Sequence, residues 1–283
     1  MLMNILHRIT DGFNPRARIG LALSGGATHG AAHIGVLKVL EAEGIKPAYV
    51  AGTSAGALVG AAYCSGIPVP EIEKLFLELE WPDLLRPTVR PKLSFFNAQP
   101  LEAFLKTCMG EKNIEDLAIP FAAIACDITT GERVVLDKGP LTPAVRASSA
   151  FPAVFPPVEV GGRLLIDGGI VDNLPVEQVR AMGAKFTIGS DVSKRGRKTK
   201  TPENPFELLF SAIYIMQDRS AYYTSDTCDI YIRPDISEYS AWGFKDSARM
   251  IDAGKQATER LLPELRHKLK QRSRPSLRTL LQG

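Results

Sequence analysis

The fold is decided by residues 17–64, ARIGLALSGGATHGAAHIGVLKVLEAEGIKPAYVAGTSAGALVGAAYC. The apolar run that opens this stretch predicts a buried parallel strand, because both faces of such a strand are covered. After it, the stretch predicts a glycine loop at 24–30 and a helix at 30–43 with apolar residues at helical spacing. A second strand at 49–51, a tight turn at 52–54 and a helix of small residues at 55–64 follow. This alternation is typical of a parallel sheet covered by helices.

The remainder of the chain continues the alternation less regularly. Further strands are predicted at 121–128, 133–136, 163–166, 185–190 and 230–233. Further helices are predicted at 70–79, 175–182, 204–222 and 246–270, and irregular, proline-rich segments at 81–100 and 146–157. The fold class that follows is α/β, with three layers (α/β/α), a mainly parallel central sheet and C-terminal helices.

The composition is that of an ordinary globular protein, with 45% hydrophobic and 23% charged residues in 283. Its four cysteines are widely spaced and form no C-x-x-C pair, which favours reduced, structural thiols over a metal site or disulfides. Residues 1–18 lack the apolar core of a secretory signal, and the apolar window 50–63 is shorter than a bilayer span. We therefore expect a cytoplasmic protein, with peripheral attachment to the inner face of the membrane as a further hypothesis.

Basic residues cluster in two places, although the net charge is only +3. The clusters comprise Lys194, Arg195, Arg197, Lys198, Lys200, Arg266, Lys268, Lys270, Arg272, Arg274 and Arg278. Runs of this kind are usually solvated faces or loops. The alternative is peripheral contact between the basic C-terminal tail and an anionic membrane. We expect no nucleic-acid partner, and the sequence predicts no particular oligomeric state.

A candidate nucleophile lies in the G-x-S-x-G sequence at residues 52–56, directly between a predicted strand and a predicted helix. A serine on such a turn, here Ser54, has its hydroxyl lifted above the edge of the sheet. Gly52 and Gly56 are required because side chains beside so sharp a turn would collide. The strand before the motif and the helix after it are what make this short pattern informative.

A serine hydroxyl needs a base to take its proton, and histidine is the usual one. In an α/β-hydrolase the histidine follows the serine and the acid along the chain, and only His267 satisfies that order. Its neighbours Arg266 and Lys268 indicate a solvated helix, which argues against a catalytic triad that includes His267. His29 and His33 precede the serine, and His7 lies in the N-terminal segment.

The other candidate base is Asp167, which ends the apolar run 164–166 and precedes two glycines. A carboxylate buried at such a position has a raised pKa and is a better base. The alternative is a turn aspartate that binds its own backbone amides. From the residues alone, the turn is the favoured interpretation.

The loop at 24–30, SGGATHG, follows the first strand and opens the first helix, so its amides face outward at a helix N-terminus. One interpretation is a dinucleotide site, which requires an acidic residue at the end of the second strand. That strand ends instead in Ala51 and Gly52. The other interpretation is an oxyanion hole made by Gly25, Gly26 and Ala27, which the nearby serine turn favours.

Along the chain the glycine loop at 24–30 comes first, the G-x-S-x-G motif at 52–56 second and Asp167 with its two glycines third. Three such motifs in that order resemble the patatin-like phospholipase family. The resemblance extends to 31–37, AAHIGVL, to 144–152, AVRASSAFP, and to 167–175, DGGIVDNLP, and it covers about 19–190. It implies a Ser54–Asp167 catalytic dyad, a lipid acyl ester as substrate (phospholipid or lysophospholipid), hydrolysis through an acyl-enzyme, and no metal or organic cofactor. The alternative is a catalytically weak or inactive member that acts as a membrane-surface or nucleotide-binding module.

The chain departs from the family pattern at two positions. The third glycine of the loop is Ala27, and the basic residue after it is His29, a candidate modulator of the loop. An unperturbed histidine is largely neutral near pH 7, so a permanent cation is missing there. The domain organisation that we expect is an N-terminal segment at 1–16, a patatin-like catalytic core at 17–192, and a C-terminal helical part at 193–283 that completes the same domain.

Overall fold

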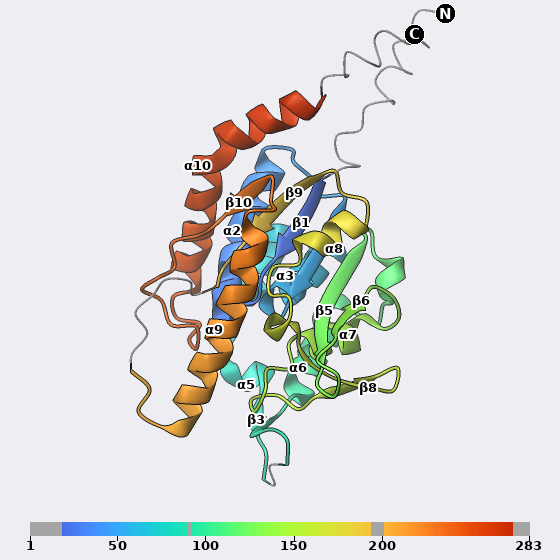
Figure 1. The fold of residues 1–283 in the computed structure, drawn as a ribbon, viewed down its shortest axis with the longest axis vertical. Coiled ribbons are helices and arrows are strands. Elements are labelled where there is room, and N and C mark those ends of the chain that lie inside the picture. The colour runs from blue at the N-terminus through green and yellow to red at the C-terminus, as the bar shows by residue number, and fades with distance from the viewer. Residues whose placement is uncertain (1–18, 90–91, 194–200, 274–283) are drawn as a thin grey trace, which may run out of the picture.

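The computed structural model describes residues 19–89, 92–193 and 201–273, and the central sheet of this part has eight strands (Figure 1). These are β1 Ile19–Leu23, β2 Tyr49–Thr53, β5 Phe121–Asp127, β6 Arg133–Leu136, β7 Val158–Val160, β8 Arg163–Asp167, β9 Phe186–Ser190 and β10 Ile230–Ile232. Their order is β10-β9-β1-β2-β5-β8-β7, and β6 also pairs with β5. A separate two-stranded sheet is formed by β3 Arg86–Pro87 and β4 Phe96–Asn97.

The strands from β10 to β5 are parallel, and the pairs that β5 makes with β6 and β8 are antiparallel, as is the pair of β7 with β8. In the parallel part, Leu21 of β1 lies opposite Val50 on one side and Ile188 on the other. All three side chains are fully buried. The prediction of a mainly parallel sheet in an α/β fold is confirmed.

Helices cover both faces of the sheet (Figure 1). They are α2 Ala31–Ala42, α3 Ala55–Cys64, α4 Val69–Glu78, α5 Trp81–Leu84, α6 Gln99–Met109, α7 Leu141–Ser148, α8 Val176–Ala181, α9 Pro205–Ser225 and α10 Ser247–Ser273. Short 3₁₀ turns occur at η2 Ala27–Gly30, η3 Ile114–Asp116 and η4 Gly168–Ile170.

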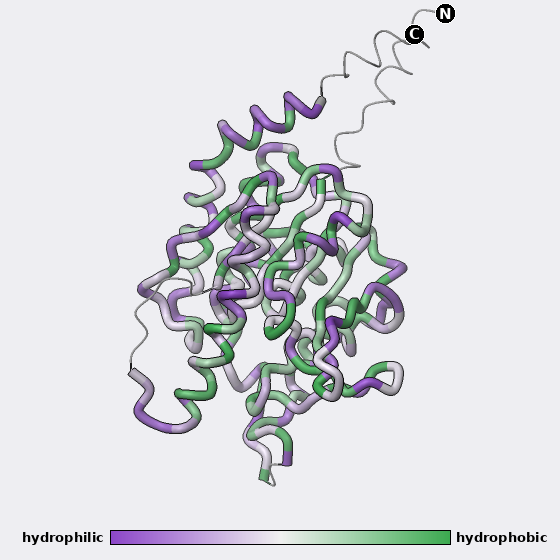
Figure 2. The backbone as a smooth tube through the Cα atoms, in the orientation of Figure 1, coloured by the Kyte–Doolittle hydropathy of each residue, from purple (hydrophilic) through white to green (hydrophobic). Residues whose placement is uncertain are grey.

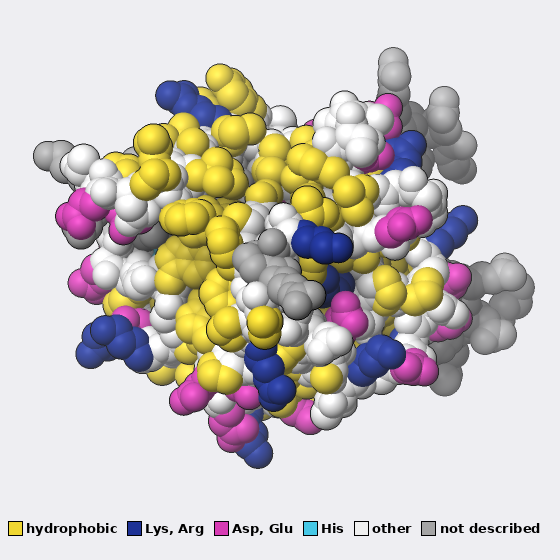
Figure 3. Space-filling model, turned by 90° about the horizontal axis from the view of Figure 1, so that it is seen from below, with side chains coloured by type: hydrophobic (Ala, Val, Ile, Leu, Met, Phe, Trp, Pro, Cys, Tyr) yellow, Lys and Arg dark blue, Asp and Glu magenta, His cyan; other side chains and the backbone are white. Residues whose placement is uncertain are grey.

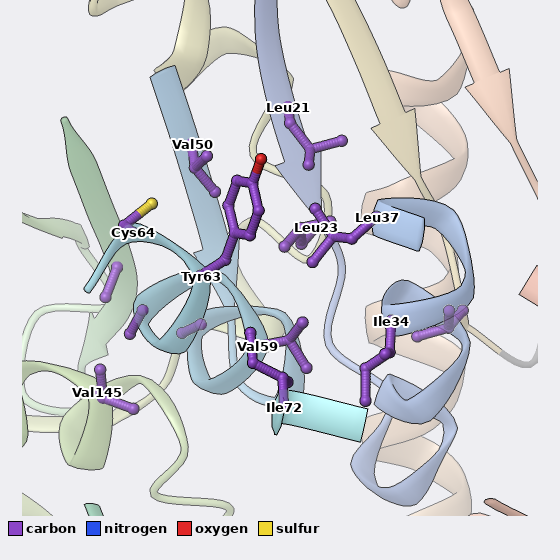
Figure 4. Close-up of a cluster of buried hydrophobic side chains, with 14 of the residues drawn as sticks. Leu21, Leu23, Ile34, Leu37, Val50, Val59, Tyr63, Cys64, Ile72 and Val145 are labelled. Atoms are coloured by element: carbon purple, nitrogen blue, oxygen red, sulfur yellow. The ribbon is translucent and has the colours of Figure 1, made fainter. Parts of the chain in front are cut away.

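The two faces differ in how they are packed. Large aliphatic side chains of β1, among them Leu21 and Leu23, meet residues of α2 and α3 such as Ile34 and Val59 in the larger core (Figure 4). On the other face Ala22 packs in a smaller cluster with residues of α8 and α9. Side chains of successive strand residues point to opposite faces, so this asymmetry follows from the alternation within β1.

The prediction that residues 146–157 form a loop is wrong at its start, because α7 runs from Leu141 to Ser148. Ala144 and Val145 are buried against the core, and tertiary packing therefore stabilises a short helix despite Pro143 in its first turn. The segment 81–100 is largely irregular as predicted, with α5 and the two short strands inside it. The part of the chain after 193 supplies β10, which pairs with β9 at the edge of the same sheet.

Candidate active site

Ser54 lies at the turn between β2 and α3 with φ of 52° and ψ of −119°, a strained conformation for a residue with a side chain. A Cβ atom at Gly52 would lie 2.4 Å from the carbonyl oxygen of Gly56, and one at Gly56 would lie 2.2 Å from that of Leu23. The turn can therefore close only with glycine on both sides of the serine. The amide of Ser54 donates a hydrogen bond to Ser148 Oγ at 3.0 Å, which helps to hold the turn.

Asp167 reaches the serine through the register of three strands. Thr53 of β2 pairs with Ile124 of β5, and Ala125, the next residue of β5, pairs with Asp167 of β8. One strand, β5, lies between β2 and β8, and adjacent strands are about 4.8 Å apart. This register places the last residue of β8 level with the serine turn.

The carboxyl group of Asp167 is fully buried. Its Oδ1 atom accepts a hydrogen bond from the amide of Gly169 at 2.8 Å, as a turn aspartate would. Its Oδ2 atom is buried and has no fully formed hydrogen bond within the described residues. Burial raises the pKa of Asp167 to about 6, while a side-chain interaction with Ser54 and the Gly169 amide act to lower it. Such loosely made contacts are common in catalytic groups without substrate.

The glycine loop passes directly beside the serine. A Cβ atom at Gly25 would lie 3.1 Å from Ser54 Cβ, and the Gly25 amide donates to the carbonyl of Asn173 at 3.2 Å. Ala27 has φ of 52°, a left-handed conformation that is unusual for alanine. Within the described residues no hydrogen bond is made by the amides of Gly26 and Ala27, and both residues line the cavity at the serine.

The histidines near the loop are buried. His29 Nε2 lies 3.0 Å from the carbonyl oxygen of Tyr239, and the ring is fully covered. His33 bridges Ser190 Oγ at 2.8 Å and the carbonyl of Ser24 at 2.9 Å, and burial lowers its pKa to about 4. His267 is exposed on α10, beside Gln271. Thus His33 and His29 support the loop from behind, and His267 has the solvated position expected from its neighbours.

A cavity begins at Ser54. Its wall is almost entirely apolar, with residues from α3, α4, α6 and α9 and from the segment before α10. The ring of Trp242 stacks on that of Phe210 with 5.7 Å between the ring centroids, and its centroid also lies 5.7 Å from that of Trp81. Such a cavity suits a hydrocarbon chain and offers few partners to a nucleotide.

Three residues near the site were not assigned a role from the sequence. Asn173 is fully buried, and neither polar atom of its side chain has a hydrogen-bond partner in the described residues. Its Oδ1 atom would lie 2.6 Å from a Cβ at Gly25 and 2.8 Å from one at Gly169, so the carboxamide lies between the two glycine-rich loops. Tyr214 and Gln217 reach the cavity from α9. Burial and the negative charge of Asp167 raise the pKa of Tyr214.

Sequence signals for these three residues differ. Asn173 stands inside the segment 167–175 that carries part of the family resemblance, and this position was a usable signal. Tyr214 and Gln217 lie in a helix with no sharp pattern, and only the packing of α9 over the loops brings them to the site. Within the described residues, no group of three histidine, cysteine, aspartate or glutamate side chains is placed to hold a metal ion.

The predicted basic surfaces are only partly within the described residues. The cluster 194–200 lies outside them, as do Arg274 and Arg278. On α10, Arg266 pairs with Glu43, Lys268 Nζ lies 2.7 Å from Glu264, and Arg272 lies 2.8 Å from Asp229. Much of this charge is therefore compensated within the chain, and contact with an anionic membrane stays a prediction.

The comparisons with known proteins agree with this geometry. The family model described as patatin-like phospholipase matches residues 21–180, and the chain belongs to that family, whose members are generally lipid hydrolases. An uncharacterized NTE family protein of Mycobacterium tuberculosis is 38% identical over 174 residues, which cover 60% of this chain and 48% of that protein.

Two animal relatives match a larger share of this chain. Neuropathy target esterase sws of Drosophila melanogaster is 31% identical over 83% of this chain and 19% of its own length. Patatin-like phospholipase domain-containing protein 6 of Mus musculus is 34% identical over 84% of this chain and 20% of its own length. The chain thus spans half or less of the length of each of these three relatives.

Among solved structures, VipD from Legionella pneumophila has a similar fold, with a TM-score of 0.52 and 15% identity over 87% of this chain and 67% of that chain. In the described residues, no helix combines the length and the apolar character that crossing a bilayer would need.

Proposed function

We propose that this protein hydrolyses carboxylic esters of phospholipids or lysophospholipids through a dyad of Ser54 and Asp167. The observation that carries the proposal is the pairing of a strained serine with a fully buried carboxyl group that interacts with the side chain of that serine. Ser54 lines an apolar cavity that can hold an acyl chain. The names of the animal relatives, an esterase and a phospholipase domain protein, support the same reaction class.

In the first half of the reaction, Asp167 takes the proton of Ser54 Oγ while that oxygen attacks the ester carbonyl carbon. Negative charge develops on the carbonyl oxygen, and in this proposal the amides of Gly26 and Ala27 donate to it. The amide of Gly25 already donates to the carbonyl of Asn173. Gly25 contributes in another way, because it has no side chain to collide with Ser54. Collapse of the tetrahedral intermediate breaks the ester bond, and the alcohol leaves with the proton from Asp167.

In the second half, water attacks the acyl-serine and gives its proton to Asp167. The free fatty acid leaves, and the proton returns to Ser54 Oγ. The raised pKa of Asp167 suits both halves, because a carboxylate with a pKa of about 6 is a stronger base than an ordinary one and is still ionised at pH 7.

The test is covalent labelling by a fluorophosphonate, followed by mapping of the labelled peptide and by mass spectrometry of the fatty acids released from phosphatidylcholine and lysophosphatidylcholine. We expect the label on Ser54 and fatty-acid release from at least one of the two lipids. Labelling elsewhere would contradict the nucleophile. Absence of both label and hydrolysis would favour the second candidate, a catalytically inactive member, for which the left-handed φ of Ala27 in the loop is the supporting observation.

A further inference from the structure

Large apolar side chains are exposed together at the start of α9 and on the segment that leads into β4. We call this surface the apolar face; it comprises Leu93, Phe95, Phe206, Leu208 and Leu209, which are 42–66% exposed. The rings of Phe95 and Phe206 meet edge to face at 5.2 Å, so the two segments form one surface. Figure 3 shows hydrophobic side chains gathered at this end of the molecule, and Figure 2 shows the hydrophobic start of α9. Exposed patches of this kind mark interaction sites.

The apolar face is continuous with the substrate cavity. One helical turn after Phe206, the ring of Phe210 packs on the rings of Phe151 and Trp242, with centroid distances of 5.6 Å and 5.7 Å. Phe151 and Trp242 belong to the wall of the cavity that contains Ser54. Apolar side chains therefore lead from the surface toward the cavity of the nucleophile, and an acyl chain that enters along them is shielded from water.

Among the residues that the structure describes, charges of both signs lie in the two segments that form the apolar face. Arg86 and Lys92 are exposed on the β3–β4 segment, and Glu203 and Glu207 are exposed at the start of α9. The basic end of α10 lies at the opposite end of the molecule (Figure 1). A surface with an apolar centre and charges of both signs at its edge matches zwitterionic phospholipids, whose headgroups carry both charges over an apolar interior.

We infer that the apolar face docks the protein on a zwitterionic phospholipid bilayer, with Phe206 and Leu208 inserted among the acyl chains. The inference rests on the proposed function, because a lipid hydrolase must take its substrate from such a surface. It differs from the expected contact through the basic tail in location and in driving force. Insertion depends on buried apolar area, whereas attraction by the tail depends on anionic lipid and is weakened by salt.

The test compares the wild type with Phe206→Gln/Leu208→Gln. Neither residue lines the cavity. The matched control is Tyr222→Gln/Tyr223→Gln, at the other end of α9, where two rings also meet, at 5.6 Å. The three proteins are sedimented with phosphatidylcholine vesicles and with vesicles that contain phosphatidylglycerol, at low and high salt. Each is also assayed on a short-chain, water-soluble ester and examined by gel filtration without lipid.

We expect the wild type and the control to bind pure phosphatidylcholine vesicles at both salt concentrations. The Phe206/Leu208 variant should bind on the order of tenfold or more weakly, because two apolar side chains no longer enter the bilayer. Its hydrolysis of the soluble ester should equal that of the wild type, which separates docking from chemistry. If all three proteins are inactive on the soluble ester but differ in vesicle binding, the docking surface stands and the proposed function fails.

Three results would overturn the docking surface. The first is equal binding of the two variants to phosphatidylcholine. The second is binding that requires phosphatidylglycerol and disappears at high salt, which would assign docking to basic segments. The third is a wild-type dimer without lipid that the Phe206/Leu208 variant fails to form, which would show that a second copy covers the face.

Discussion

Asp167→Asn removes the proposed base and keeps the shape of its side chain. The amide oxygen can still accept the hydrogen bond that Oδ1 receives from Gly169, so the turn after β8 should persist. Loss of a general base typically lowers the rate by about 10²–10⁴-fold. We expect a decrease of that size in kcat/KM for the soluble ester at pH 8, where the wild-type carboxylate is ionised.

The same substitution should change how stability depends on pH. Burial raises the pKa of Asp167 from 3.8 to about 6, so the folded protein binds this proton more tightly than the unfolded chain does. The stability that proton binding contributes is fully present below pH 3.8 and is lost as the pH rises through about 6. At 1.36 kcal/mol per pKa unit, the wild type loses about 3 kcal/mol over this range, and an asparagine, which does not titrate, avoids that loss.

The measurement is the free energy of unfolding in guanidinium chloride at pH 4 and pH 8 for the wild type and for Asp167→Asn. Any cost of the new amide N–H is the same at both pH values and cancels in the comparison. Asp226→Asn, at an exposed position after α9, is the matched control and should follow the wild type. A pH dependence of Asp167→Asn equal to that of the wild type would show that the carboxyl group is not desolvated, and the reasoning from burial would fail.

Three further changes test other parts of the site. Ser54→Ala should abolish fluorophosphonate labelling, and adding Asp167→Asn should lower activity little further, because the members of one catalytic unit fail together; additive losses would contradict the dyad. Asn173→Asp should shift the acid limb of the kcat/KM profile to higher pH, because a second carboxylate beside the two loops raises the pKa of Asp167. An unchanged profile would place Asn173 outside the reach of the dyad. His29→Ala should lower the free energy of unfolding by about 1–3 kcal/mol through the lost contact with Tyr239, as thermal or chemical denaturation would measure; unchanged stability would make that contact unimportant.

The features that the sequence determined by itself are local ones. The turn at Ser54 could be predicted because the clash that Gly52 avoids is with the carbonyl of Gly56, only four residues away. The clash that Gly56 avoids is with Leu23 of the neighbouring strand β1, and it appears only once the sheet has formed. The strand, loop and helix order of residues 17–64 could be predicted because burial on both faces of a parallel strand leaves a continuous apolar run. The short helix α7 could not, since eight residues with a proline have little helical preference without the core against which they pack.

The features that only the tertiary structure decided depend on which distant segments meet. Asp167 becomes a neighbour of Ser54 through the register of β2, β5 and β8, and its pKa rises only because the assembled loops exclude water. In the same way α9 brings Tyr214 to the cavity, and the pairing of Arg272 with Asp229 compensates charge that is unpaired in the sequence. Burial and electrostatic interaction act between atoms close in space, and for these residues closeness in space is set by the sheet order and not by position along the chain.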